Sequence, residues 1–229
     1  MALKITNTNE VASNGIKIIV YGIAGSGKTS LLATVPRIVI VSAEKGLLSI
    51  VGTGIPVLLI ESYEDLEEAY QWLINPANSQ YFDAIGLDSL TEIGEVVLAK
   101  AKSLYKDQRL AYTELADKTI SLIKKFRDIN NKHVILICKI ENYKEDLTGI
   151  TKYFPSMPGV KLTNRIPYLV DEVFYLGLKT DLQSGQTQRY IQTQPDHQVV
   201  AKDRSGKLNT YEPPNLGYII NKIKGVSNG

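Results

Sequence analysis

The chain has 229 residues, 44% of them hydrophobic and 22% charged, which is enough for one α/β domain with a sizeable core or for two small domains. The 26 basic and 24 acidic side chains give a formal net charge of +2, so bulk charge neither indicates nor excludes a nucleic-acid partner. The single cysteine, Cys138, excludes an intrachain disulfide. No apolar stretch approaches the ~20 residues of a transmembrane helix. We expect a cytoplasmic protein without a membrane partner, with 1–14 as a flexible segment before one domain at 15–229.

Short apolar runs alternate with amphipathic segments in the first part of the chain. Strands are expected over 16–21, 37–41, 57–60, 82–87 and 134–138, and helices after Lys28 and over 62–74, 89–105 and 109–129. Strands that alternate with helices predict an α/β fold with a mainly parallel sheet flanked by helices.

The rest of the chain has a different pattern. Residues 141–167 contain three prolines and two glycines and are expected to form a long irregular loop, which is usually functional or mobile. Strands expected over 172–178, 189–193 and 198–201 are joined by short turns, so they predict antiparallel strands at the C-terminal side of the sheet. A helix over 214–223 is expected to close the fold.

Residues 22–29 match the phosphate-binding pattern G-x-x-x-x-G-K-[ST], between an expected strand and an expected helix. In this pattern main-chain N–H groups wrap the β-phosphate, and the helix N-terminus adds partial positive charge. We expect Lys28 to reach the β- and γ-phosphates and the Thr29 hydroxyl to bind Mg²⁺. The residues expected to contact ATP are Gly22, Ile23, Ala24, Gly25, Ser26, Gly27, Lys28, Thr29 and Ser30.

Two acidic residues stand at the ends of expected strands. Asp88 ends its strand as the acid of a Walker B segment does, so it is predicted to hold the metal with Thr29. The pair Asp88–Ser89 also suits a helix cap, and the two roles are compatible. Glu44 follows the second strand and should open at the same sheet edge, so it is the predicted base for the attacking water, with Glu92 as second choice.

The order strand, P-loop, helix, a strand ending in Glu44 and a strand ending in Asp88–Ser89 resembles the RecA-type recombinase core. The resemblance implies a RecA-like P-loop fold in which Glu44 activates water. Recombinases place a γ-phosphate-sensing residue, usually glutamine, at the tip of the next core strand. This chain has Lys139 there, which departs from that pattern.

Residues 199–206 are similar to the lysine-x-arginine segment of hexameric replicative helicases of the DnaB type. The resemblance implies that Lys202 and Arg204 are catalytic residues that contact the γ-phosphate bound by a neighbouring subunit, where cations stabilise developing charge. A solvated hairpin with two surface cations is the alternative.

Over residues 15–223 the chain looks most like the short RecA-core ATPases that bacteriophages encode, which are linked to recombination and single-strand annealing. This resemblance implies a Mg²⁺-dependent, DNA-stimulated ATPase that forms a ring or filament, in a phage-infected or prophage-bearing bacterial cell. The implied partners are single-stranded DNA and a single-strand binding protein. The stretch expected to contact DNA interleaves cations and rings, as sequence-tolerant binding requires: Tyr143, Lys144, Lys152, Tyr153, Phe154, Lys161 and Arg165.

Three other functions remain open for a P-loop chain. A kinase would transfer phosphate to a nucleotide or small molecule, and it needs an arginine-bearing lid, whereas 141–167 has only Arg165. A GTP switch would show Asn-Lys-x-Asp after a strand, and the nearest string, at 131–134, lacks the aspartate. A nucleotide-binding scaffold without turnover would be insensitive to Glu44→Gln.

Overall fold

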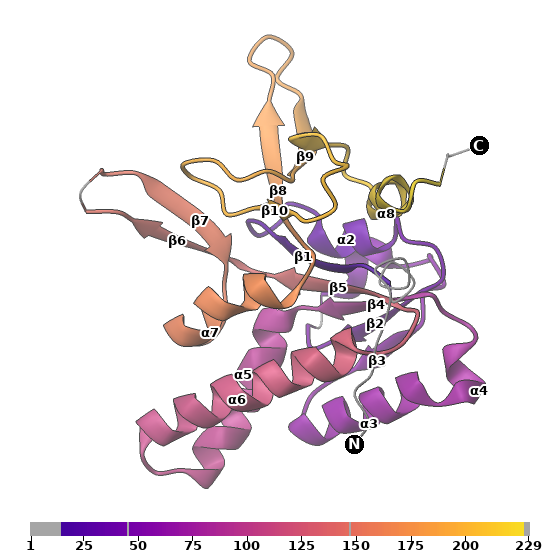
Figure 1. Cartoon of the computed structure of the whole chain (residues 1–229), viewed down its shortest axis with the longest axis vertical. Coiled ribbons are helices and arrows are strands. Elements are labelled where there is room, and N and C mark those ends of the chain that lie inside the picture. Colours follow the sequence, from indigo (N-terminus) through magenta and orange to yellow (C-terminus); the bar gives the residue numbers. More distant parts are fainter. Residues whose placement is uncertain (1–14, 45, 147, 227–229) are drawn as a thin grey trace, which may run out of the picture.

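The computed structural model describes residues 15–44, 46–146 and 148–226 (Figure 1), so the predicted flexible segment 1–14 lies outside the described residues. The strands are β1 (Lys17–Tyr21), β2 (Ile38–Ser42), β3 (Val57–Leu59), β4 (Ala84–Asp88), β5 (His133–Cys138), β6 (Ile140–Lys144), β7 (Thr151–Pro155), β8 (Glu172–Thr180), β9 (Thr187–Gln192), β10 (Lys202–Asp203) and β11 (Tyr211–Glu212). The helices are α2 (Lys28–Leu32), α3 (Tyr63–Ile74), α4 (Pro76–Ser79), α5 (Leu90–Leu104), α6 (Gln108–Arg127), α7 (Val160–Arg165) and α8 (Leu216–Lys224), with 3₁₀ turns η2 (Leu47–Ile50) and η3 (Ile166–Leu169).

The main sheet has the order β11-β9-β8-β1-β5-β4-β2-β3, and β10 pairs with β8. Strand β1 is parallel to both of its neighbours, β5 and β8, and the pairs β5–β4, β4–β2 and β2–β3 are also parallel. The later strands β9, β10 and β11 pair antiparallel. The predicted α/β class, with a mainly parallel sheet and antiparallel C-terminal strands, is confirmed.

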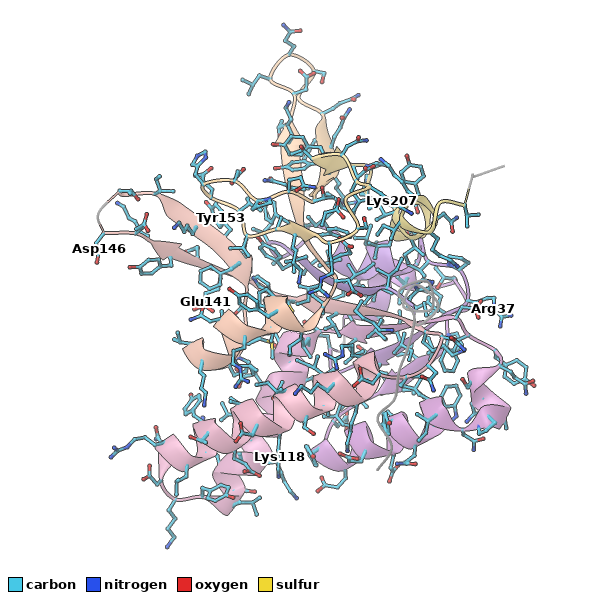
Figure 2. The ribbon with its side chains drawn as sticks, in the orientation of Figure 1. Arg37, Lys118, Glu141, Asp146, Tyr153 and Lys207 are labelled. Carbon is cyan, nitrogen blue, oxygen red and sulfur yellow. The ribbon has the colours of Figure 1, made fainter. Side chains whose placement is uncertain are left out.

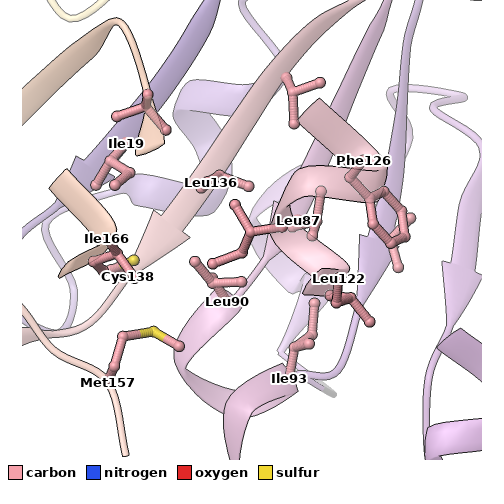
Figure 3. Close-up of a cluster of buried hydrophobic side chains, with 14 of the residues drawn as sticks. Ile19, Leu87, Leu90, Ile93, Leu122, Phe126, Leu136, Cys138, Met157 and Ile166 are labelled. Atoms are coloured by element: carbon pink, nitrogen blue, oxygen red, sulfur yellow. The ribbon is translucent and has the colours of Figure 1, made fainter. Parts of the chain in front are cut away.

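Successive residues of the parallel strands point to opposite faces, so the sheet has an apolar core on each side. On one face Ile19, Leu87 and Leu136 belong to the core that α3, α5, α6 and α7 complete (Figure 3). On the other face α2 and α8 cover the sheet, with Leu32 and Ile219 fully buried. Burial on both faces explains why the strands read as continuous apolar runs. Cys138 is buried inside the first core.

Polar side chains set where the helices begin. Helix α3 starts at a capping box, in which Ser62 Oγ accepts from Asp65 N at 3.2 Å and an Asp65 carboxylate oxygen accepts from Ser62 N at 2.7 Å. Helix α5 starts at Ser89, whose Oγ accepts from Glu92 N at 3.3 Å. No helix in the described part of the chain is long and apolar enough to cross a membrane.

The expectation of an irregular loop over 141–167 is wrong. Strands β6 and β7 form a separate antiparallel hairpin, and α7 and η3 follow it. Two of the residues that suggested a loop stand at element ends: Pro155 ends β7 and Gly159 is the N-cap of α7.

The strand expected over 198–201 is also misplaced. This stretch makes an isolated bridge from Val199 to Tyr153, and ladder pairing begins at Lys202. The physical reason is local, since Asp196 Oδ1 accepts from the N–H groups of Gln198 and Val199 at 2.7 Å each and holds them in a turn.

Candidate nucleotide-binding site

The P-loop joins the carboxyl end of β1 to α2 and packs against β8. A Cβ added to Gly22 would lie 2.6 Å from the carbonyl oxygen of Leu176, so a larger residue there would collide with backbone. Gly27 has φ 93°, in the left-handed region that favours glycine. The loop therefore needs glycine at these two positions to hold its shape.

Lys28 folds back over this loop. Its Nζ donates to the carbonyl oxygens of Gly22 at 2.9 Å and Ile23 at 2.8 Å, and burial lowers the pKa of its ammonium. Ser26 Oγ is buried beneath the loop without a hydrogen-bond partner among the described residues. A bent glycine-rich loop with an ammonium beside it fits a bound phosphate chain.

Thr29 and Asp88 form the pair expected of a magnesium site. Thr29 Oγ1 donates to Asp88 Oδ2 at 2.7 Å, and Asp88 is 1% exposed. Burial raises the pKa of the Asp88 carboxyl, an effect that a bound cation would oppose. An oxygen-rich pair of this kind suits Mg²⁺, which takes few protein ligands together with phosphate oxygens.

Glu44 is held at the carboxyl edge of the sheet by hydrogen bonds. Ser89 Oγ donates to Glu44 Oε1 at 2.6 Å, and Ser42 Oγ donates to the Glu44 carbonyl at 2.8 Å. Ser89 therefore orients Glu44 and also caps α5. Asp88 instead contacts Thr29. The metal-binding role and the helix-capping role thus belong to different residues. Glu92, the second choice for a base, is engaged in an ion pair with Lys139.

These groups meet in one cavity of about 560 Å³. The predicted residues on its wall are Gly22, Ala24, Gly25, Gly27, Lys28, Thr29, Ser30, Glu44, Asp88 and Lys139, joined by Ser49, Ile140 and Arg189. Sequence reasoning missed Arg189 as a site residue, because nothing local in the sequence shows that a side chain of β9 reaches the P-loop.

The sequence matches a family model described as an AAA domain over residues 14–205. The chain belongs to this AAA domain family. Together with the P-loop geometry, the match identifies the AAA domain as a nucleotide-binding P-loop ATPase domain. None of the curated proteins compared matches the sequence. Among solved structures, a KaiC-like protein from the hyperthermophilic archaeon Pyrococcus horikoshii OT3 is similar, with 14% identity, a TM-score of 0.46 and 78% of each chain covered. A likeness this distant carries no argument about the site.

The predicted finger residues of the AAA domain lie away from this cavity. Strand β10 pairs with the first residues of β8, at the amino ends of the parallel strands, whereas the P-loop follows their carboxyl ends. Lys202 Nζ donates to two main-chain carbonyls, of Pro167 and Val170, at 2.6 Å each. The Arg204 side chain is 60% exposed, so a neighbouring molecule could reach it, and it pairs with Asp171 at 3.0 Å. The structure thus does not bring either cation to the nucleotide cavity of the same chain.

In the AAA domain, the residues expected to contact DNA form a half-buried group and an exposed group. Tyr153 stacks on Tyr175 at 6.3 Å, and Lys152 pairs with Glu145 at 3.2 Å. Phe154 is half-buried, whereas Tyr143, Lys144, Lys161 and Arg165 are exposed. Figure 2 shows Asp146 at the tip of the β6–β7 hairpin and Tyr153 closer to the body of the protein.

Proposed function

We propose that this AAA domain hydrolyses ATP with Mg²⁺ and couples hydrolysis to single-stranded DNA, in recombination or strand annealing of the bacteriophage type. The observation that carries the proposal of hydrolysis is the 2.6 Å hydrogen bond from Ser89 to Glu44. It holds a carboxylate on the wall of the cavity that the P-loop forms, where a water attacking the γ-phosphate needs a base.

Each group then has a chemical task. Lys28 and the P-loop amides bind the triphosphate, and Thr29 and Asp88 would hold Mg²⁺, which screens phosphate charge when bound. Glu44 takes a proton from water as the water oxygen bonds to the γ-phosphorus. The bond from the γ-phosphorus to the bridging oxygen breaks, and ADP leaves with that oxygen, where the Lys28 ammonium stabilises the charge.

The β6–β7 hairpin offers a route for coupling to DNA. Lys139 and Ile140 line the nucleotide cavity, and β6 begins at Ile140. Tyr143 and Lys144, farther along the same strand, expose a ring and a cation. Rings and cations of this kind stack on bases and bind phosphates without sequence preference. A shift of the cavity wall on γ-phosphate binding would reach the DNA-contacting side chains directly.

The position of Arg204 supports assembly into a ring or filament. Strand β10 pairs with the amino end of β8, away from the P-loop, so a finger role for Arg204 requires the nucleotide of a neighbouring copy. A single-strand binding protein is a further partner that the resemblance to phage recombination ATPases suggests.

The test is an ATPase assay on the full chain, with and without single-stranded DNA, across a range of protein concentrations. Turnover per chain should rise with both, and Lys28→Ala should abolish it. A response that is flat in DNA and in concentration would argue against the coupled oligomer while leaving the ATPase intact. Radiolabelled phosphate appearing on an added nucleotide acceptor in place of free phosphate would favour a kinase.

A further inference from the structure

Arg189 of β9 lies directly against the P-loop. A Cβ built on Gly27 would be 2.9 Å from Arg189 Nε and 3.0 Å from Cζ, so the guanidinium packs on the Gly27 main chain. Strand β9 holds it there, because Arg189 pairs with Leu178 on β8, and β8 is the parallel neighbour of β1. In Figure 1 the β8–β9 hairpin rises beside α2, the helix that follows the P-loop.

The Arg189 guanidinium is also available to bind a ligand. Lys28 is bound to loop carbonyls and Lys139 is paired with Glu92. In the described part of the chain Arg189 has neither a hydrogen bond from its side chain nor a carboxylate partner, and it is exposed on the cavity wall. It therefore contributes positive charge to a cavity that also contains the carboxylates Glu44 and Asp88.

We propose that Arg189 binds the triphosphate of the nucleotide held by its own chain, closing the outer side of the P-loop. Gly27 immediately precedes Lys28, so the guanidinium lies beside the loop segment that wraps the phosphates. A planar guanidinium donates two parallel hydrogen bonds to phosphate oxygens, which an ammonium does not. Arg189 then acts within one chain, and Arg204 across the interface between two chains. This inference rests on the proposed nucleotide-binding function and names a further residue of it.

A second ligand position for Arg189 has to be separated from this one. The same side chain lines a neighbouring cavity of about 430 Å³ with Tyr190 and Tyr211, where a guanidinium could stack on a nucleobase. Tripolyphosphate has the phosphates of ATP but no nucleoside, so it distinguishes the two positions.

The experiment measures binding of a non-hydrolysable ATP analogue and of tripolyphosphate, with Mg²⁺, by titration calorimetry on the full chain. Arg189→Ala and Arg189→Gln should each weaken both ligands by about tenfold or more, the loss expected for a charge-assisted hydrogen bond. Arg189→Lys should fall between these variants and the wild type. The control is Arg109→Ala, since Arg109 lies on α6 with its side chain 95% exposed and the charge change is the same. Thermal unfolding checks that each variant is folded. If Arg189→Ala destabilises β9, Arg189→Gln still tests the loss of the charge.

The possible binding results distinguish failure of the Arg189 assignment from failure of nucleotide binding as a whole. Weaker binding of the ATP analogue with unchanged tripolyphosphate binding would place Arg189 on the nucleoside and overturn the phosphate assignment. Wild-type affinity in both Arg189 variants, with binding lost in Lys28→Ala, would overturn the inference alone. If the wild-type chain bound neither ligand, the proposed nucleotide-binding function would fail together with the inference.

Discussion

Ser89 Oγ donates to Glu44 Oε1 at 2.6 Å, and this bond joins the ends of two neighbouring parallel strands, β4 and β2. Ser89 occupies the position directly after Asp88, where many ATPases carry their catalytic glutamate. The carboxylate is instead supplied from the next strand, and the serine fixes its direction. We therefore propose that Ser89 positions the Glu44 carboxylate and that Glu44 takes the proton from water.

Turnover should respond in a graded way to loss of this pair. Glu44→Gln should reduce kcat by about 10²–10⁴-fold, because it removes the general base. Ser89→Ala should reduce kcat by roughly tenfold to hundredfold, since it removes only the orientation of that base. Steady-state hydrolysis at saturating ATP measures both, and nucleotide affinity should stay unchanged. Wild-type turnover in Glu44→Gln would remove Glu44 from the mechanism.

Ser89 is also the N-cap of α5, so its substitution carries a stability cost of about 1 kcal/mol. Ser62→Ala is the matched control, because Ser62 caps α3 outside the cavity. The two variants should lose similar stability in urea titrations, and only Ser89→Ala should lose turnover. Equal activity in both variants would remove the positioning role.

Removal of the buried carboxylate should change the metal requirement. Asp88→Asn keeps the shape of the side chain but not its charge, so half-maximal nucleotide binding should need about 10–100-fold more Mg²⁺. Asp83→Asn is the control, since Asp83 lies just before β4 and pairs with Arg37 on the surface. Thermal unfolding with the ATP analogue, with and without EDTA, gives a second readout: EDTA should lower the wild-type melting temperature more than that of Asp88→Asn.

The parts of this site that the sequence predicted depend on local spacing. The P-loop is a contiguous motif, and Asp88 and Glu44 follow apolar runs that end at one edge of a parallel sheet, so their meeting is a consequence of topology. Arg189 could not be found in this way. Its approach to Gly27 depends on the register of the β8–β9 hairpin, which pairs Arg189 with Leu178. The β6–β7 hairpin was missed because prolines and glycines, which usually indicate a loop, stand at element ends here, such as Pro155 at the end of β7.

Stability should depend on pH through Glu172, which is 1% exposed at the start of β8. Burial, and then the nearby Asp203, raise the pKa of the Glu172 carboxyl from 4.5 to about 8. The folded state thus retains a proton that the unfolded chain loses above its ordinary pKa. The contribution of this group is fully present below about pH 4.5 and falls by up to about 1.4 kcal/mol per pH unit as the pH rises towards 8.

Glu172→Gln mimics the neutral acid, so its free energy of unfolding should lack this fall. Urea titrations at several values between pH 5 and pH 8 should show the variant gaining on the wild type as the pH rises. Glu68→Gln, at an exposed position on α3, controls for the loss of one carboxylate. A constant difference between Glu172→Gln and wild type across this range would contradict the assignment.

Lys139 should connect the γ-phosphate to the β6–β7 hairpin. Its ion pair with Glu92 raises the pKa of the ammonium, and a γ-phosphate in the cavity would compete with Glu92 for it. Lys139→Ala should weaken the ATP analogue by about tenfold relative to ADP and reduce stimulation by DNA. Lys118→Ala, which breaks an ion pair with Glu114 on α6, is the control. An unchanged ratio of ATP-analogue to ADP affinity would exclude Lys139 as the sensor.

Arg204 should act only between chains, and mixing two inactive variants tests this. Glu44→Gln chains have an intact Arg204 but no base, whereas Arg204→Ala chains have the base but no finger. A mixed assembly contains interfaces at which an Arg204→Ala chain binds the ATP and a Glu44→Gln neighbour supplies the arginine. Turnover should therefore return on mixing to a measurable fraction of the wild-type rate.

Because Arg204 pairs with Asp171, Asp171→Asn controls for loss of that ion pair and should leave turnover close to wild type. Activity that stays at the sum of the two separate variants would exclude a role for Arg204 across the interface.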